Sequence, residues 1–219
     1  DDIDAAVDAA KEAFNTWSKT PKQERSDILM KLADAIEKNF EELVKAESKD
    51  NGKPESLAAH VDIPRAPANI RFFAGAILHD SAKVHEMDGM AINYTLREPL
   101  GVAACISPWN LPLYLLTWKV APALAAGNTV VAKPSEVTPM TAYLFSKICI
   151  EAGLPKGVLN IVHGLGSKVG DPLTTHPDVP VVSFTGGTVT GKHIASITAP
   201  MFKKLSLELG GKNPNIVFS

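Results

Sequence analysis

The chain has 219 residues, of which 45% are hydrophobic and 21% are charged, and its formal net charge is -2. This is an ordinary globular composition, and a chain of this length can bury a sizeable core. The near-neutral balance gives no support to a nucleic-acid or anionic-membrane partner, and no stretch resembles a signal peptide or a transmembrane helix. Cys105 and Cys149 have no metal-ligand spacing, so we expect no metal site and a cytoplasmic protein.

Residues 1–80 are predicted to be helical. A second helix is expected from a Thr-x-x-Gln capping box at Thr20 to a stop at Gly52, and a third, weaker pattern covers residues 70–77. The first helix is indicated by apolar residues that recur at steps of three and four, which places them on one helical face: Ile3, Val7, Ala10, Phe14 and Trp17.

Residues 81–99 change period. Asp88-Gly89 is a hairpin-turn signal, and the stretch INYTLRE that follows it alternates apolar and polar side chains. We therefore expect a β-hairpin in this region.

From residue 100 onward, short apolar runs alternate with helical segments. The runs are GVAACIS, NTVVAKP, GVLNIVHG, VPVVSFTGG, KKLSLELGG and the final NIVF. This alternation predicts an α/β fold with a Rossmann-like parallel sheet and helices on both faces. Ligands of such sheets bind beyond the carboxyl ends of the strands, so the segments to inspect are SPWN, KPSE, HGLG, FTGG and ELGG.

Taken one at a time, these segments have ordinary explanations. Gly186 and Gly187 suit either a phosphate at a helix N-terminus or a tight turn that needs glycine. Lys133 and Glu136 could bind the two hydroxyls of a ribose, although a solvated surface pair is the commoner role of such residues. HGLGSKVG lacks the spacing of a dinucleotide fingerprint and is a weaker signal.

Three further residues are candidates for chemistry. Asn110 could donate its amide to a developing oxyanion or could cap the next helix. Glu208 could be a general base whose pKa is raised by an apolar pocket, or an edge residue bonded to nearby amides. Cys105 lies inside an apolar strand, where a thiol behaves as a small buried hydrophobe, so we reject it as a nucleophile.

Together, in the order SPWNLPL, GNTVVAKPSE, FTGGTVTG and LELGGKNP, these motifs resemble the N-terminal, coenzyme-binding half of the aldehyde dehydrogenase superfamily. The resemblance covers essentially the whole chain. It implies a truncated aldehyde dehydrogenase fold: N-terminal helices of the coenzyme-binding domain (1–80), an oligomerisation hairpin (81–99) and an NAD-binding α/β domain (100–219). The catalytic domain and the nucleophilic cysteine of the family are expected to lie outside this chain.

The resemblance also implies residue roles. Asn110 matches the residue that holds the substrate oxygen, Glu208 matches the base that activates water, and Trp118 and Lys119 fall on the helix that lines the substrate side. Glu136 indicates NAD rather than NADP, because a carboxylate repels a 2′-phosphate. Gly187 replaces a serine found in many members. The cofactor-binding set is Ile106, Trp109, Lys133, Ser135, Glu136, Gly166, Phe184, Thr185, Gly186, Gly187, Leu209 and Gly210.

Within the family, VDIPRAPANIRFFA is similar to the corresponding stretch of 2-aminomuconic and 2-hydroxymuconic semialdehyde dehydrogenases, the former an enzyme of tryptophan catabolism. Arg65 then matches a residue that binds the substrate carboxylate, or it merely pairs with Asp62. The implied activity is NAD-dependent oxidation of an aldehyde, by a homodimer or homotetramer when the protein is full length. The alternatives are an inactive dinucleotide-binding protein and an NADP-dependent semialdehyde or acyl reductase.

Overall fold

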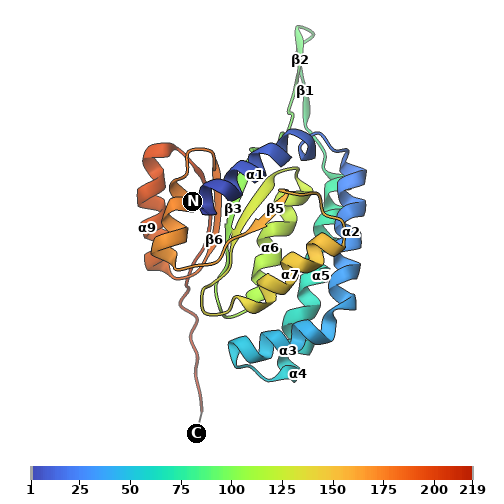
Figure 1. Ribbon diagram of the computed structural model, residues 1–219. Coiled ribbons are helices and arrows are strands. Elements are labelled where there is room, and N and C mark those ends of the chain that lie inside the picture. Colours follow the sequence, from blue (N-terminus) through green and yellow to red (C-terminus); the bar gives the residue numbers. More distant parts are fainter. Residues whose placement is uncertain (1, 219) are drawn as a thin grey trace.

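The computed structural model describes residues 2–218, and Figure 1 shows their arrangement. Helices form the N-terminal part, in agreement with the sequence. They are α1 (Asp2–Trp17), α2 (Lys22–Lys38), α3 (Phe40–Asn51), the short α4 (Glu55–Leu57), the π-helix η1 (Ala58–Asp62), α5 (Ile63–Ala76) and the 3-10 turn η2 (Ile77–His79). No helix among residues 2–218 is both long and apolar enough to cross a membrane.

The second predicted helix is two helices in the structure. Asn39 adopts φ -98° and ψ 17° between α2 and α3, and its side chain donates a hydrogen bond to the Ala35 carbonyl. The predicted capping box is also wrong, because the Thr20 hydroxyl donates back to Thr16. Asparagine and threonine side chains compete with the backbone for local hydrogen bonds, and this competition decides helix boundaries that apolar spacing does not show.

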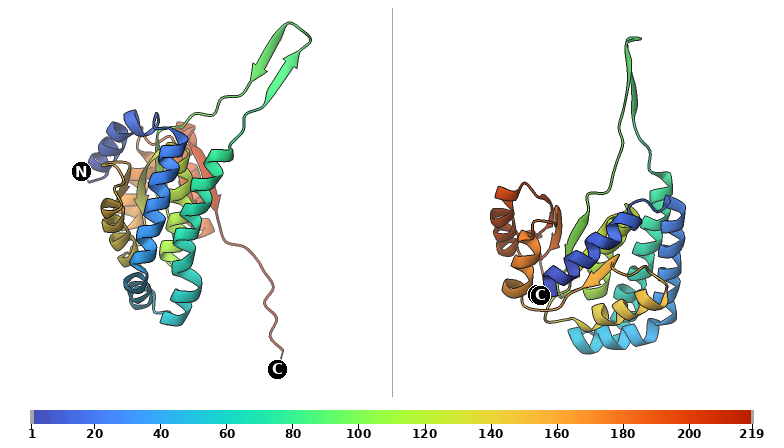
Figure 2. Two further views of the ribbon diagram at one scale, coloured as in Figure 1. Left: turned by 90° about the vertical axis from the view of Figure 1, so that its right-hand side faces the viewer. Right: turned by 45° about the horizontal axis from the view of Figure 1, so that its top comes forward.

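The predicted hairpin is confirmed as β1 (Val84–Met87) paired antiparallel with β2 (Ala91–Tyr94). Asp88 and Gly89 both have positive φ angles, 45° and 74°, as a two-residue turn of this hand requires. Figure 2 shows that the hairpin extends well away from the rest of the molecule, and both of its strands are exposed along their whole length.

A five-stranded parallel sheet forms the centre, in the order β5-β4-β3-β6-β7. Its strands are β3 (Val102–Ile106), β4 (Thr129–Lys133), β5 (Leu159–Ile161), β6 (Val181–Thr185) and β7 (Lys204–Glu208). The connecting segments are α6 (Pro112–Ala125), α7 (Met140–Glu151), η3 (Gly166–Gly170) with α8 (Asp171–Thr175), and α9 (Thr188–Thr198) with η4 (Ala199–Met201).

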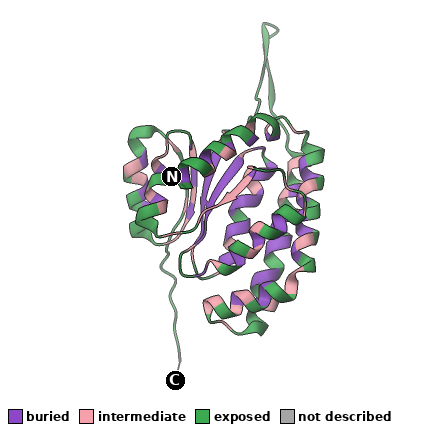
Figure 3. Ribbon diagram, in the orientation of Figure 1, coloured by how far each residue is buried: buried purple, intermediate pink, exposed green. Residues whose placement is uncertain are grey.

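Alternate residues of β3 face opposite sides of the sheet, and each side has its own hydrophobic core. Ala103 and Cys105 belong to the core formed with α2, α5, α6 and α7. Val102, Ala104 and Ile106 belong to the core formed with α8, α9 and the first half of α1. β3 and β4 are buried along their whole length, as Figure 3 shows. The predicted Rossmann-like sheet with helices on both faces is therefore confirmed.

The predicted strand at NIVF is wrong for the described residues. Residues 209–218 form no strand, and Ile216, Val217 and Phe218 are 72%, 85% and 89% exposed. An apolar run becomes a strand only where a neighbouring strand supplies hydrogen bonds, and this segment extends away from the sheet in Figure 1. Ser219 lies outside the described residues.

Candidate functional site

The segments that follow the strands meet at one edge of the sheet. β3 and β6 are neighbours, but β4 and β5 lie to one side of them and β7 lies to the other, so the strand order reverses between β3 and β6. Such a reversal opens a crevice beyond the strand ends, where open α/β sheets bind ligands. Here a cleft of about 610 Å³, which we call the switch-point cleft, lies among the ends of β3, β4 and β6 and helices α8 and α9.

An adjoining hollow of about 640 Å³ continues the switch-point cleft toward β7. The two share five lining residues, Pro108, Trp109, Thr185, Gly186 and Gly187. Every residue assigned to the cofactor from the sequence lines one or both of them. The switch-point cleft takes Ile106, Trp109, Lys133, Ser135, Glu136, Gly166, Phe184, Thr185, Gly186 and Gly187, and the hollow takes Leu209 and Gly210 together with Asn110, Trp118 and Glu208.

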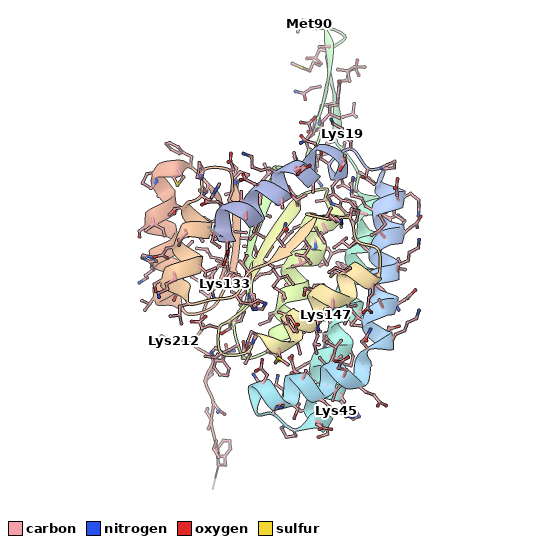
Figure 4. The ribbon with its side chains drawn as sticks, viewed as in Figure 1. Lys19, Lys45, Met90, Lys133, Lys147 and Lys212 are labelled. Carbon is pink, nitrogen blue, oxygen red and sulfur yellow. The ribbon has the colours of Figure 1, made fainter. Side chains whose placement is uncertain are left out.

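The ion pair at the end of β4 joins a buried lysine to an exposed glutamate, so Lys133 is not the solvated surface residue that its charge alone favours. Lys133 is only 3% exposed, and its Nζ donates to Glu136 Oε2 at 3.0 Å and to the Pro134 carbonyl at 3.1 Å. Figure 4 shows Lys133 near the centre of the molecule, whereas Lys45 lies at its periphery. The pKa of the Glu136 carboxyl is lowered, first by its own backbone amide and also by Lys133 and the Gly166 amide, against an opposing effect of partial burial.

The two glycines after β6 have different environments. A Cβ on Gly186 would lie 2.5 Å from Cζ of Phe184, so packing alone requires glycine there. A Cβ on Gly187 would meet no heavy atom of the described residues within 4 Å, so this position is open toward the switch-point cleft. Gly187 precedes α9, and no side chain of the described part caps that helix. Its first amides are thus suited to an anion in the cleft.

Asn110 is not the cap of the helix that follows it. α6 begins at Pro112 with Leu111 at the N-cap position. Asn110 is exposed instead and lines the adjoining hollow, which also contains Glu208. The structure therefore brings the two residues proposed for chemistry into one hollow, from β3 and β7 on either side of β6.

The surroundings of the Glu208 side chain differ from the predicted apolar pocket. β7 is at the edge of the described sheet, and the Glu208 side chain is exposed rather than enclosed in an apolar pocket. Its backbone carbonyl accepts a hydrogen bond from the Gly186 amide at 3.0 Å, which ties the end of β7 to the glycine turn. The apolar pocket expected around this carboxyl group is absent from the described residues.

Both cysteines are buried, as expected. Cys105 is 1% exposed, and burial raises the pKa of its thiol to about 12, although neighbouring Lys119 acts in the opposite direction. Burial also raises the pKa of the Cys149 thiol. Because the thiolate is the nucleophile, neither group is suited to attack a substrate. Lys119 is itself buried on α6, donates to the Ser183 hydroxyl at 3.2 Å, and has a pKa lowered by burial.

Arg65 lies outside both the switch-point cleft and the adjoining hollow. Its guanidinium stacks over the Tyr114 ring at 5.8 Å from the centroid, and that ring makes an edge contact with Trp118 of the adjoining hollow. Asp62 forms an ion pair with Lys53. The alternative that Arg65 merely pairs with Asp62 is therefore wrong.

Sequence reasoning missed a group of polar residues behind Asn110. Asn51 and Lys53 donate hydrogen bonds to the carbonyls of Trp109 and Asn110, and Glu47 is fully buried next to Lys53. One signal was present in the sequence: Glu47 follows Leu43 by four residues and so occupies a core position of its helix. A charged residue on an apolar face is rarely buried without a partner.

A parallel sheet with helices on both faces and a lined crevice at its switch point defines an open α/β domain. The sequence model of the Aldehyde dehydrogenase family matches residues 1–219. The chain belongs to this family.

Individual relatives agree with this assignment. The chain is 56% identical to 2-aminomuconic semialdehyde dehydrogenase from Bos taurus over 219 residues, which are 100% of this chain and 45% of the relative. It is 50% identical to 2-hydroxymuconic semialdehyde dehydrogenase from Pseudomonas sp. (strain CF600), covering 100% of this chain and 46% of the relative. The chain thus spans less than half the length of these relatives.

A solved structure of an aldehyde dehydrogenase from Bacillus cereus, described as an NAD+ complex, is also similar. It matches with a TM-score of 0.95 and 44% identity, over 99% of this chain and 44% of that one. The agreement in fold extends over nearly the whole chain.

We predict that Cys105 and Cys149 resist alkylation in the native protein. Iodoacetamide at about pH 8 should modify less than about 10% of either thiol in the time that fully alkylates glutathione, because the buried thiols are protonated and inaccessible. Mass spectrometry of the digested protein measures this. Denaturation in guanidinium should make both react. Rapid labelling of Cys105 in the native state would contradict the burial described above.

Proposed function

We propose that the full-length protein oxidises an aldehyde to a carboxylic acid with NAD as the hydride acceptor. The observation that carries the proposal is the placement of two sets of residues along the switch-point cleft and the adjoining hollow. Buried Lys133, paired with Glu136, lies at one end, and Asn110 lies with Glu208 at the other. A dinucleotide is an elongated ligand whose ribose and reactive ring require such separate contacts.

The residues present fit NAD. Lys133 and the ionised Glu136 supply a donor and an acceptor for the hydroxyls of the adenosine ribose. The uncapped N-terminus of α9 and the open position at Gly187 suit the pyrophosphate. Trp109, Leu209 and Gly210 lie at the end where the nicotinamide would be held. When bound, NAD supplies the acceptor for a hydride.

The chain's own residues would serve two steps of the reaction. Addition of a cysteine thiolate to the aldehyde carbonyl makes a carbon–sulfur bond and an oxyanion, and the Asn110 amide donates a hydrogen bond to that oxygen. Loss of the hydride leaves a thioester. Glu208 then takes a proton from water, whose oxygen attacks the thioester carbon and displaces the thiolate, releasing the acid. We place the nucleophilic cysteine in the part of the relatives that this chain does not span.

We further propose that the aldehyde bears a carboxylate, as a muconic semialdehyde does. Arg65 is exposed and has no carboxylate partner among the ion pairs of the described residues, so its guanidinium is available to a substrate. Stacking on Tyr114 fixes its direction while leaving its donors available. The homodimer or homotetramer and the cytoplasmic location expected from the sequence remain predictions.

We predict that Glu208→Gln in the full-length protein blocks release of the acid while sparing hydride transfer. The rapid burst of NADH should remain within about threefold of the wild type, and steady-state kcat should fall by about 10²–10⁴-fold, the usual contribution of a general base. Stopped-flow absorbance measures both. Glu151→Gln, at the exposed end of α7, is the control and should leave both unchanged. Steady-state turnover of Glu208→Gln at the wild-type rate would refute the role of Glu208.

We predict that Glu136→Gln weakens NAD binding and narrows the preference over NADP. Loss of a charged acceptor for the ribose hydroxyls should raise the Kd of NAD by about 10-fold or more, and loss of repulsion should lower the Kd of NADP. Fluorescence titration of the two dinucleotides measures the Kd values. Tighter binding of NADP than NAD by the wild type would contradict the cofactor assignment.

We predict that Arg65→Met discriminates between aldehydes. Its kcat/KM should fall by about 10–100-fold for an aldehyde that carries a carboxylate, and by less than about twofold for an uncharged aldehyde of similar length, because only the former uses the guanidinium. Arg71→Met, on the same helix but paired with Asp34 and Glu37, is the matched control and should affect neither. An equal fall for both aldehydes would show that Arg65 does not bind a carboxylate.

A further inference from the structure

The turn that carries Asn110 needs external support. Residues 107–111 connect β3 to α6 without belonging to either. The Leu111 carbonyl accepts a hydrogen bond from the Leu115 amide of α6, whereas the carbonyls of Trp109 and Asn110 accept hydrogen bonds from side chains of other elements. The rigidity of this turn therefore depends on side chains from other elements.

Two of these donors come from the last residue of α3 and from the loop that follows it. Asn51 Nδ2 donates to the Trp109 carbonyl at 2.6 Å, and Lys53 Nζ donates to the Asn110 carbonyl at 3.0 Å. Gly52 lies between them with φ 81° and ends α3 in the left-handed conformation. This conformation reverses the chain within one residue and favours glycine. The reversal brings the side chains on both sides of Gly52 to the same turn.

Lys53 is held from behind by two buried carboxyl groups. Its side chain is 8% exposed, forms an ion pair with Asp62, and lies 3.9 Å from Glu47 Oε1. Burial raises the pKa of Glu47 to about 7, outweighing the opposing effects of the neighbouring Thr141 and Lys53. Of the two carboxyl groups, that of Asp62 lies nearer to the Lys53 ammonium. The ammonium has a fixed direction, which a solvated lysine lacks.

This cluster is poorly suited to a purely stabilising role. Among the described residues, both Glu47 carboxyl oxygens and Asp62 Oδ1 are buried without a hydrogen-bond partner. Buried polar atoms left unpaired reduce the free energy of unfolding, and apolar residues of similar volume often replace a buried ion pair without loss. The cluster nevertheless directs one donor at one carbonyl, that of Asn110.

We propose that Asn51 and Lys53 are positioning residues that fix the backbone of Trp109 and Asn110, so that the Asn110 amide points at the substrate oxygen. This inference rests on the proposed role of Asn110 in the reaction. It assigns to the first, helical part of the chain an indirect effect on transition-state stabilisation, through the position of Asn110. Misplacement of such a donor by about 1 Å can cost up to about 100-fold in rate.

A double-mutant cycle in the full-length protein tests the proposal. The clamp variant Lys53→Met/Asp62→Leu removes the donor together with the carboxylate of its closer ion pair. Loss of Lys53 also removes an effect that lowers the pKa of buried Glu47, which favours the neutral form of that carboxyl group. We expect it to lower kcat by about 10-fold with Asn110 present, and by less than about twofold in the Asn110→Ala background. The Kd of NAD should stay within about twofold of the wild type, because the contacts at Lys133 and Glu136 are untouched.

A milder variant covers the case in which the clamp variant does not fold. Asn51→Ala leaves the charged cluster intact and should lower kcat by about threefold, again only when Asn110 is present. Lys45→Met, an exposed lysine on α3 visible in Figure 4, is the matched control and should change nothing.

The outcomes separate the inference from the proposed function. The positioning role would be overturned if the clamp variant lowered kcat equally with Asn110 and with Ala at position 110. It would also be overturned if the clamp variant and Asn51→Ala both had the kcat of the wild type. Either result would leave the proposed function intact. Wild-type kcat in Asn110→Ala itself would refute the proposed role of Asn110, and the positioning role with it. A loss of kcat that occurs only when Asn110 is present supports both the positioning role and the proposed function.

Discussion

β3 pairs in parallel with β4 on one side and with β6 on the other, and this double pairing determines where the functional residues of the chain lie. Parallel strands end at the same edge of a sheet, so the segments after β3, β4 and β6 come together although they are up to about 80 residues apart along the chain. The reversal of strand order leaves the space between them unfilled by a connecting helix. The cleft is thus a consequence of topology, and its chemistry is a consequence of which residues end each strand.

Much of this could be predicted from the sequence, because the relevant signals are local. The change from helical to alternating spacing marked the sheet, and Asp88-Gly89 marked the hairpin. The strand-end rule then selected the segments that line the cleft. The sequence alone leaves two roles open for each of these residues, and the structure decides between them. Lys133 is buried rather than solvated, and Asn110 does not cap helix α6.

The sequence predictions that are wrong concern features that long-range packing determines. Asp62 is only three positions from Arg65 but nine positions from Lys53, so local spacing favours the wrong partner. The pairing with Lys53 is visible only in the folded structure. The NIVF segment has strand-like composition, but composition cannot supply a neighbouring strand. The exposure of Glu208 follows from the edge position of β7, which depends on the strand order and not on the residues of the strand.

Residues 50–53, the end of α3 and the start of the loop that follows it, also contact α7. Asp50 accepts a hydrogen bond from the Met140 amide at 2.8 Å, at the first residue of α7, a few residues after Glu136. One short segment, residues 50–53, is therefore bonded both to the turn that bears Asn110 and to the helix that follows the ribose pair. It links the ribose pair in the switch-point cleft to Asn110 in the adjoining hollow. A change in the length of this segment would shift the ribose pair and Asn110 together.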